Sequence, residues 1–174
     1  MTILVALSGL PGVGKTTLAK ALAAQVKAVH LRVDSVETAL KNSVLRIDPS
    51  EDAGYLAIAS VAVDNLLLGF DVIADTVNPI EITRNLWART AASGSAHLLN
   101  VEVVCSDRAI HRYRVEARES DIQGLVMPDW QKVANRKFDP WKVDRLIVDT
   151  SVDEIKKCAS KVVAEMQKLK SADR

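Results

Sequence analysis

The stretch that decides the fold is Ser8-Gly9-Leu10-Pro11-Gly12-Val13-Gly14-Lys15-Thr16-Thr17. Residues 9–16 fit G-x-x-x-x-G-K-[ST], the phosphate-binding P-loop motif. The apolar run 3–7 before it predicts a buried strand, and residues 17–24 after it are strong helix formers. Glycines let such a loop turn its N–H groups toward phosphate oxygens, and the helix N-terminus adds a positive dipole end. The motif therefore predicts a phosphate-binding strand–loop–helix unit.

The loop itself supplies the residues that we expect to bind a nucleotide: Gly9, Leu10, Pro11, Gly12, Val13, Gly14, Lys15, Thr16 and Thr17. In this motif the lysine reaches the outer phosphates and the hydroxyl that follows it ligates Mg²⁺. ATP and Mg²⁺ are thus the expected cofactors, and a preference for GTP over ATP is left open. A chance glycine-rich turn is the alternative interpretation, and the flanking strand and helix disfavour it.

The composition is that of an ordinary globular protein. The chain has 174 residues, 48% of them apolar and 26% charged, which fits one domain over residues 1–174 with a sizeable core. A formal net charge of +1 gives no overall attraction to nucleic acid or to an anionic membrane. Cys105 and Cys158 lack metal-binding spacing and are expected to be buried, inert thiols. The N-terminal apolar run is too short for a signal peptide or a membrane span, so a cytoplasmic protein is expected.

Strand and helix patterns alternate along the chain. Strands are predicted over 3–7, 29–33, 70–75, 98–105 and 145–149. Helices are predicted over 17–24, 36–45 (capped by Asp34 or Ser35), 53–68 (ended by Gly69), from Asn78-Pro79 to 92, after Ser106 or Asp107, and from Ser151 or Asp153 to 169. This alternation predicts an α/β fold, a five-stranded parallel sheet sandwiched by helices. Ligands of such sheets bind at the carboxyl ends of the strands.

The segment 119–141 interrupts this alternation. It holds Gly124, Pro128, Pro140 and two of the three tryptophans, without a long periodic run. A long irregular segment in a compact domain is either a functional lid or a short helical insertion.

Two aspartates are predicted to end strands at the edge where the P-loop lies. Asp34 is a candidate base that orients an acceptor hydroxyl toward the γ-phosphate, and a helix-capping role is the alternative. Asp75 follows apolar residues and is a candidate Mg²⁺ ligand together with Thr16, with capping of the next turn as the alternative.

Arginines concentrate just before the irregular segment, at 112, 114 and 118. A solvated face paired with Glu116 and Glu119 is one explanation. The other is that Arg114 and Arg118, one helical turn apart, stabilise charge on a transferring phosphoryl group. Arg136 is a further candidate within the segment. The three histidines show no ligand spacing and no acidic partner, so no role is assigned to them.

Taken together, these motifs resemble the small P-loop kinases that phosphorylate hydroxyls. Residues 10–17 with Val33-Asp34-Ser35 resemble chloramphenicol phosphotransferase, where the matching aspartate is the base. Residues 72–76 with Asn78-Pro79 are similar to polynucleotide 5′-hydroxyl kinases, whose lid arginines match Arg114 and Arg118. Residues 121–125 and 138–150 resemble adenylylsulfate kinase, although that family has Gly-Asp-Asn-Val-Arg where this chain has Val-Asp-Ser-Val-Glu at 33–37. The resemblance implies a P-loop nucleotide-kinase fold with a lid at about 119–141.

The sequence therefore predicts an ATP-dependent phosphotransferase, with a small molecule that bears a hydroxyl as the acceptor. Lys15, Asp34, Arg114 and Arg118 are the expected catalytic residues. An adenylylsulfate kinase or a polynucleotide 5′-hydroxyl kinase is the alternative within this class, and the near-neutral charge makes nucleic acid an unexpected partner. A P-loop ATPase or switch that binds a protein partner is the alternative from another class. A monomer and a homodimer both remain open.

Overall fold

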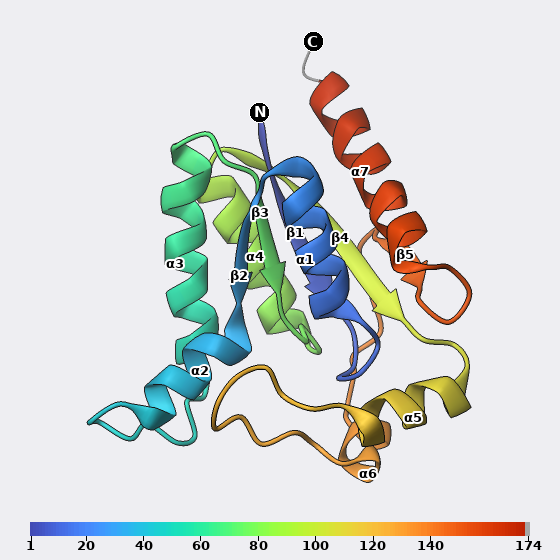
Figure 1. Ribbon diagram of the computed structural model, residues 1–174. Helices are drawn as coiled ribbons and strands as arrows, with labels where there is room; N and C mark the ends of the chain where they lie inside the picture. Colours follow the sequence, from blue (N-terminus) through green and yellow to red (C-terminus); the bar gives the residue numbers. More distant parts are fainter. Residues whose placement is uncertain (173–174) are drawn as a thin grey trace.

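The first strand lies at the centre of the molecule and is buried on both faces. In the computed structural model, which describes residues 1–172, Ile3 to Leu7 are fully buried. The elements are β1 (Thr2–Ser8), α1 (Lys15–Val26), β2 (Val29–Arg32), α2 (Val33–Asn42), α3 (Ala53–Leu67), β3 (Val72–Asp75), α4 (Glu81–Ser93), β4 (Ala96–Val104), α5 (Arg108–Ala117), α6 (Trp130–Ala134), β5 (Leu146–Asp149) and α7 (Ile155–Ser171) (Figure 1).

The sheet has the strand order β2-β3-β1-β4-β5, and every neighbouring pair is parallel. The predicted five-stranded parallel α/β sheet is confirmed. Leu7 and Arg32 both pair with Asp75, so the carboxyl ends of β1, β2 and β3 meet at one edge of the sheet. The connections from β1 and β3 leave in opposite directions, which makes this edge the expected place for a ligand.

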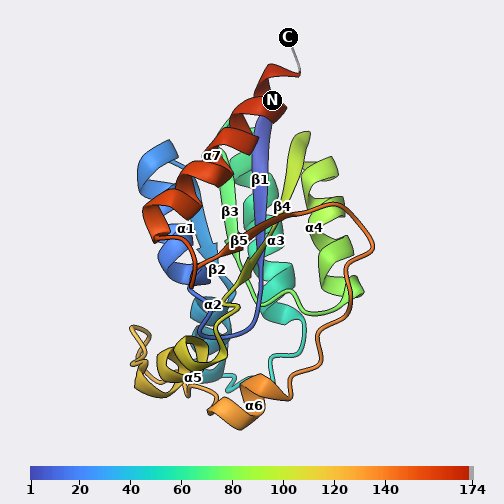
Figure 2. The same cartoon turned by 90° about the vertical axis from the view of Figure 1, so that its right-hand side faces the viewer.

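The alternation of side chains along β1 divides the core in two. Ile3, Val5 and Leu7 face α1 and α7, whereas Leu4 and Ala6 face α3 and α4. Figure 2 shows α1 and α7 on one side of the sheet and α4 on the other. A continuous apolar strand is therefore required at this position, because helices cover both of its faces.

Several predicted helix ends are confirmed. Asp107 caps α5, and its carboxylate accepts hydrogen bonds from the N–H groups of Ala109 and Ile110 at 2.8 and 3.0 Å. Gly69 follows α3 with a φ of 92°, the left-handed conformation expected after a helix.

Cys105 and Cys158 are buried free thiols, as expected.

The predicted start of α4 at Asn78-Pro79 is wrong. Asn78 has a φ of 50° and a fully buried side chain, and the helix begins only at Glu81. The carbonyls of Asn78 and Pro79 accept hydrogen bonds from the Arg84 guanidinium, so this stretch is held as a loop.

The predicted start of the last helix is also wrong. The Ser151 hydroxyl donates to Asp149, and Asp153 pairs with Lys157, so neither residue caps a helix. Helix α7 begins later, at Ile155, because these side chains are already engaged.

Candidate active site

The loop between β1 and α1 adopts the conformation that phosphate binding requires. Gly9 and Gly14 have φ values of 139° and 99°, which L side chains rarely adopt. A Cβ atom at Gly9 would lie 2.2 Å from the carbonyl oxygen of Val103, so only glycine fits there. Within residues 1–172, no side chain caps the N-terminus of α1. Its first N–H groups therefore point into the loop as donors for an anion.

Lys15 lies within this loop rather than on the surface. Its ammonium donates a hydrogen bond to the carbonyl oxygen of Leu10 at 3.0 Å, and the residue is only 9% exposed. Burial lowers the pKa of Lys15 to about 8, although the carboxylates of Asp75 and Asp34 partly oppose this shift. No carboxylate of residues 1–172 forms an ion pair with Lys15, which favours the binding of an anionic ligand beside it.

Asp75 ends β3 beside Thr16, as predicted. The residue is 3% exposed, and burial alone would raise its pKa. A hydrogen bond from His30, the charge of Lys15 and a hydrogen bond from Thr16 outweigh burial and hold the pKa of Asp75 below its usual value. A hydroxyl and an ionised carboxylate in contact are the hard oxygen ligands that suit Mg²⁺, so the donor set fits this ion.

His30 is a residue that the sequence analysis missed. Its Nε2 lies 3.2 Å from an Asp75 carboxylate oxygen, although no acidic partner was expected for it. The contact follows from the sheet order, since β2 lies next to β3 rather than next to β1. No local pattern in the sequence reveals that β2 and β3 are neighbours. In the structure, His30 is positioned to orient the Asp75 carboxylate.

Asp34 reaches the site from a different element than predicted. Strand β2 ends at Arg32 and α2 begins at Val33, so Asp34 lies in the first turn of a helix rather than at a strand end. Neither Asp34 nor Ser35 caps this helix. The helix begins early because Val33, which is 3% exposed, packs into the core beneath α3. The Asp34 carboxylate still lines a pocket with Lys15, 3.9 Å from the Arg32 guanidinium.

Arg112 and Arg114 on α5 and Arg118 directly after it have different surroundings. Arg112 is exposed and pairs with Glu116, as the solvated-face interpretation holds. Arg114 donates to the hydroxyl and carbonyl oxygens of Thr150 at 2.7 and 3.0 Å. Because the Thr150 hydroxyl donates in turn to the Val13 carbonyl, Arg114 braces the P-loop. Arg118 lies at the end of α5, and burial lowers the pKa of its guanidinium.

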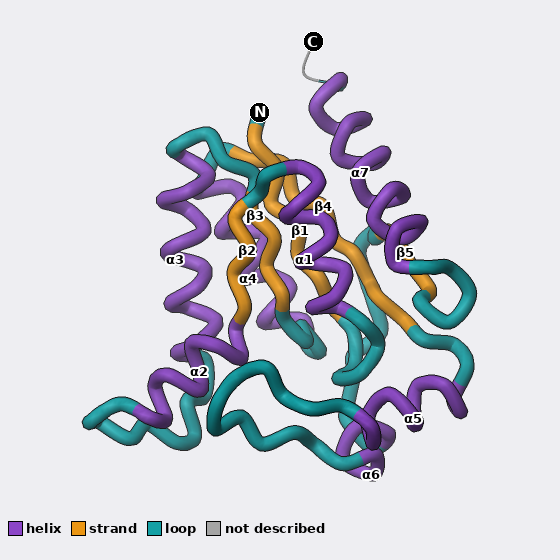
Figure 3. Tube along the Cα trace, viewed as in Figure 1, coloured by secondary structure: helices purple, strands orange, loops and turns teal. Residues whose placement is uncertain are grey.

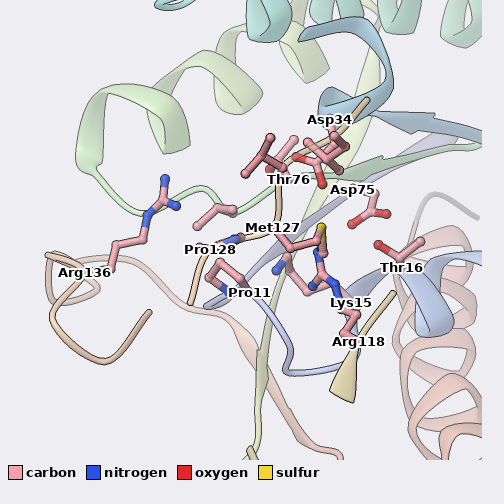
Figure 4. Close-up of a pocket in the computed structure, with 13 residues that line it drawn as sticks. Pro11, Lys15, Thr16, Asp34, Asp75, Thr76, Arg118, Met127, Pro128 and Arg136 are labelled. Atoms are coloured by element: carbon pink, nitrogen blue, oxygen red, sulfur yellow. Dashed lines mark hydrogen bonds between the residues drawn. The ribbon is translucent and has the colours of Figure 1, made fainter. Parts of the chain in front are cut away.

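Two pockets open at this edge of the sheet, and both contain Lys15, Thr16 and Arg118. Figure 4 shows the narrower of the two. The wider pocket, about 620 Å³, has five cationic and two acidic side chains and includes Gly12 and Gly14 of the P-loop. The narrower pocket, about 160 Å³, lies on the side of Asp34 and Asp75. Its remaining lining residues are Pro11, Thr76, Val77, Leu125, Val126, Met127, Pro128 and Arg136.

The segment 119–141 covers the narrower pocket. Figure 3 shows it as loop apart from the short helix α6, so the predicted short helical element is present, whereas a function as a lid stays a prediction. We call residues 119–141 the lid segment. Asp121 ties its beginning to Lys20 and Arg32, each at 2.7 Å. Asp121 is about half exposed in both ion pairs, whereas Arg32 is 12% exposed. Ion pairs with such an exposed partner contribute little to stability.

Arg84 holds the other end of the lid segment. Its guanidinium donates to the carbonyl oxygens of Asp139 and Pro140 at 2.8 and 3.0 Å. The same group lies over the rings of Phe138 and Trp141, at 5.1 and 4.1 Å from their centroids. The downstream end is therefore fixed much more firmly than the upstream end.

His111 links the P-loop to the lid segment and is a second residue that the sequence did not reveal. Its Nε2 donates to the Pro11 carbonyl oxygen at 2.8 Å, and the residue is 6% exposed. Its ring meets the edge of Trp130, on α6, with centroids 5.1 Å apart. The only signal in the sequence was a histidine on the helix that precedes the lid segment. Its two partners are distant in the chain, since Pro11 lies 100 residues away and Trp130 lies in α6.

The whole arrangement is a parallel α/β fold with a P-loop, and residues of the segment 119–141 line a pocket beside that loop. The family model AAA_33, described as an AAA domain, matches residues 4–156, and the chain belongs to this family. A search of curated proteins gives no match. Among residues 1–172, no helix is long and apolar enough to span a membrane.

Solved structures of kinases share this fold. APS kinase of Mycobacterium tuberculosis, in complex with AMPPNP and APS, is 17% identical, covers 95% of this chain and 98% of its own, and has a TM-score of 0.68. A gluconokinase of Sinorhizobium meliloti is 17% identical over 97% of this chain and 92% of its own, with a TM-score of 0.63. Kti12 of Chaetomium thermophilum, with ADP-AlF3, is 20% identical over 92% and 97%, with a TM-score of 0.68. The resemblance to small P-loop kinases is thus confirmed at the level of the fold.

Proposed function

We propose that the protein is an ATP-dependent phosphotransferase that moves the γ-phosphate of ATP to a hydroxyl of a small-molecule acceptor. The observation that carries the proposal is the junction of two pockets at Lys15, Thr16 and Arg118. A transfer enzyme needs a donor site and an acceptor site that meet at the transferred group, whereas hydrolysis needs only the donor site and water. The cationic wider pocket suits a triphosphate, and the narrower one suits the acceptor.

The residues then have distinct roles. The P-loop amides and Lys15 bind the β- and γ-phosphates. Arg118 faces the negative charge that develops on the transferring phosphoryl group, and Arg114, which also lines the wider pocket, adds a second positive charge. Thr16 and Asp75 would hold Mg²⁺, which neutralises phosphate charge when bound. Asp34 accepts the proton as the acceptor oxygen attacks the γ-phosphorus. The bond from that phosphorus to the bridging oxygen breaks, and ADP leaves.

The charge and the size of the acceptor pocket argue against a polynucleotide. A strand-binding kinase needs a basic track, whereas the chain has a net charge of +1 and the pocket is small and partly apolar. The kinases with this fold act on acceptors as different as APS and, for the gluconokinase, a sugar acid. The fold therefore does not select among small hydroxyl compounds.

The test is the dependence of ADP release on an acceptor. With ATP and Mg²⁺, we expect slow ADP release that rises at least tenfold with one class of small hydroxyl compound, and label from γ-labelled ATP on that compound. Rapid ATP turnover without an acceptor, stimulated by a protein partner, would favour an ATPase or switch. Label on the 5′ end of an oligonucleotide, with binding that weakens steeply in salt, would favour a polynucleotide kinase.

A further inference from the structure

We propose that the acceptor is a small anionic hydroxy compound, a carboxylate or a phosphate ester, whose anionic group is bound by Arg136. This inference rests on the proposed function, because it assigns the narrower pocket to the acceptor. It names a class of ligand and a residue that recognises it.

The polar groups of the narrower pocket are separated into two ends. Figure 4 shows Thr16, Asp75 and Lys15 together at one end and Arg136 at the other. Among the other lining residues, Val77 and the lid residues 125–128 are apolar apart from their backbone. An acceptor whose hydroxyl lies beside Asp34 therefore meets a guanidinium as the charged group at its far end.

The Arg136 side chain is free to bind a ligand. Within residues 1–172, its guanidinium has no hydrogen bond and no ion pair. The lysines nearby do have partners, since Lys132 lies 3.8 Å from Asp129 and Lys137 lies 3.9 Å from Asp139. Arg136 also acts on the site electrostatically, because its charge contributes to the lowered pKa of Lys15.

Desolvation then determines the charge of the acceptor. An acceptor that fills the pocket removes water from the guanidinium, and a desolvated charge without a partner is costly. A carboxylate or a phosphate would form two parallel hydrogen bonds with it, whereas a neutral hydroxyl compound would leave it unpaired. The acids nearby do not replace the ligand. Asp75 is engaged by His30 and Thr16, and Asp34 lies toward Arg32. Glu37 interacts electrostatically with Arg136, but within residues 1–172 the two form no ion pair.

The backbone holds Arg136 in position. It follows α6, and its N–H donates to the Val133 carbonyl oxygen at 3.2 Å. Two residues later the chain enters the contacts of Phe138 and Asp139 with Arg84. The guanidinium is thus presented from a fixed part of the lid segment, as a binding residue should be.

The experiment measures binding and transfer on matched compounds. Glycerol, glycerate and glycerol phosphate form one set, and ribose, ribonate and ribose phosphate form the other. Binding is measured by calorimetry with ADP and Mg²⁺ present, and transfer is measured with γ-labelled ATP. We expect an anionic member to bind at least about tenfold more tightly than its neutral counterpart, as one charged hydrogen bond would give. The carboxylates and phosphates show which anion the site prefers.

Three variants separate the role of Arg136 from that of general charge. Arg136→Gln is expected to weaken binding of the anionic compound by about 10- to 100-fold, with little change for ATP or for the neutral compounds. Arg136→Lys should restore part of the loss, since a lysine keeps the charge but not the fork. Lys137→Gln removes a neighbouring exposed cation and should change nothing.

Three results would overturn the inference: tighter binding of the neutral compounds, no binding of any anionic compound, or a loss of ATP affinity in Arg136→Gln with acceptor binding intact. The last result would place the guanidinium on the donor. Arg136-dependent binding of an anion without transfer of label would instead support the anion site and refute the kinase function, so the two failures are distinguishable.

Discussion

Asp34→Asn separates the catalytic interpretation of Asp34 from a structural one. The substitution keeps the shape of the side chain but removes its charge and its capacity to take a proton. Within residues 1–172, the Asp34 side chain has one ion pair, to Arg32 at 3.9 Å, and is 34% exposed. Such a pair contributes at most about 1 kcal/mol. Because that corresponds to roughly 2–4 °C in a chain of this size, we expect the melting temperature to change by no more.

The expected effect on transfer is much larger. A positioned carboxylate that accepts the hydroxyl proton contributes about 10²–10⁴-fold, or roughly 3–5 kcal/mol of the barrier. We therefore expect kcat to fall at least about a hundredfold, with an unchanged dissociation constant for ATP. Single-turnover transfer from γ-labelled ATP measures the chemical step, and calorimetry measures nucleotide binding.

Asp64→Asn is the matched control, since Asp64 is an exposed residue of α3 and lines neither pocket. It makes the same chemical change away from the site, and transfer should survive. If Asp34→Asn keeps kcat within about threefold of wild type, the assignment of Asp34 is refuted, and Asp75 becomes the next candidate.

Three further outcomes are expected. Because burial lowers the pKa of Lys15 from 10.5 to about 8, the unfolded chain binds more protons between these values, so wild-type stability should rise with pH there. In urea titrations, Lys15→Met should be more stable than wild type at pH 7 and lose this advantage between about pH 8 and 10.5. A stability advantage that does not change with pH would show that burial of the charged ammonium is not its cause. His111→Phe should weaken ATP binding and lower the protection of α6 against hydrogen exchange, because it removes the hydrogen bond to the Pro11 carbonyl. His111→Gln should restore both properties. Equal behaviour of the two variants would mean that this hydrogen bond is unimportant. Asp121→Asn should speed amide hydrogen exchange at residues 119–129 without changing the melting temperature, because it removes the ion pairs to Lys20 and Arg32. Wild-type protein with ATP and acceptor should show the slowest exchange in these residues. Equal protection in every state would mean that the segment is a static insertion.

The donor side of the site could be predicted from the sequence because its information is local. The P-loop motif names the residues and the turn, and the strand and helix beside it fix where Lys15 and Thr16 lie. Asp75 follows the same logic, since it directly ends a buried strand. These predictions depend only on neighbours within a few residues.

The acceptor side and the bracing residues could not be predicted, because their partners are distant in the chain. His30 meets Asp75 only because β3 inserts between β1 and β2. Arg84 lies within a predicted helix and no pattern in the sequence distinguishes it, yet its guanidinium contacts residues 138–141. The helix-capping rules also failed at Asn78 and Ser151. The backbone of Asn78 is held by long-range contacts, since its N–H donates to the Tyr55 hydroxyl, and the Ser151 hydroxyl accepts a hydrogen bond from the Asp107 N–H.

The origin of the lining residues has a consequence for how such proteins diversify. The wider pocket is built mainly from the P-loop, α1 and the end of α5, with Glu119 and Asp121 from the start of the lid segment, and a Cβ at Gly9 of the P-loop would already collide with β4. Much of the narrower pocket comes from the lid residues 125–128 and 136, which line it and not the wider pocket. Substitutions there can change the shape and the charge of the acceptor site without disturbing ATP binding or the core. Amino-acid substitutions in the lid segment alone can therefore change which acceptor is bound, while the proposed phosphoryl transfer stays the same.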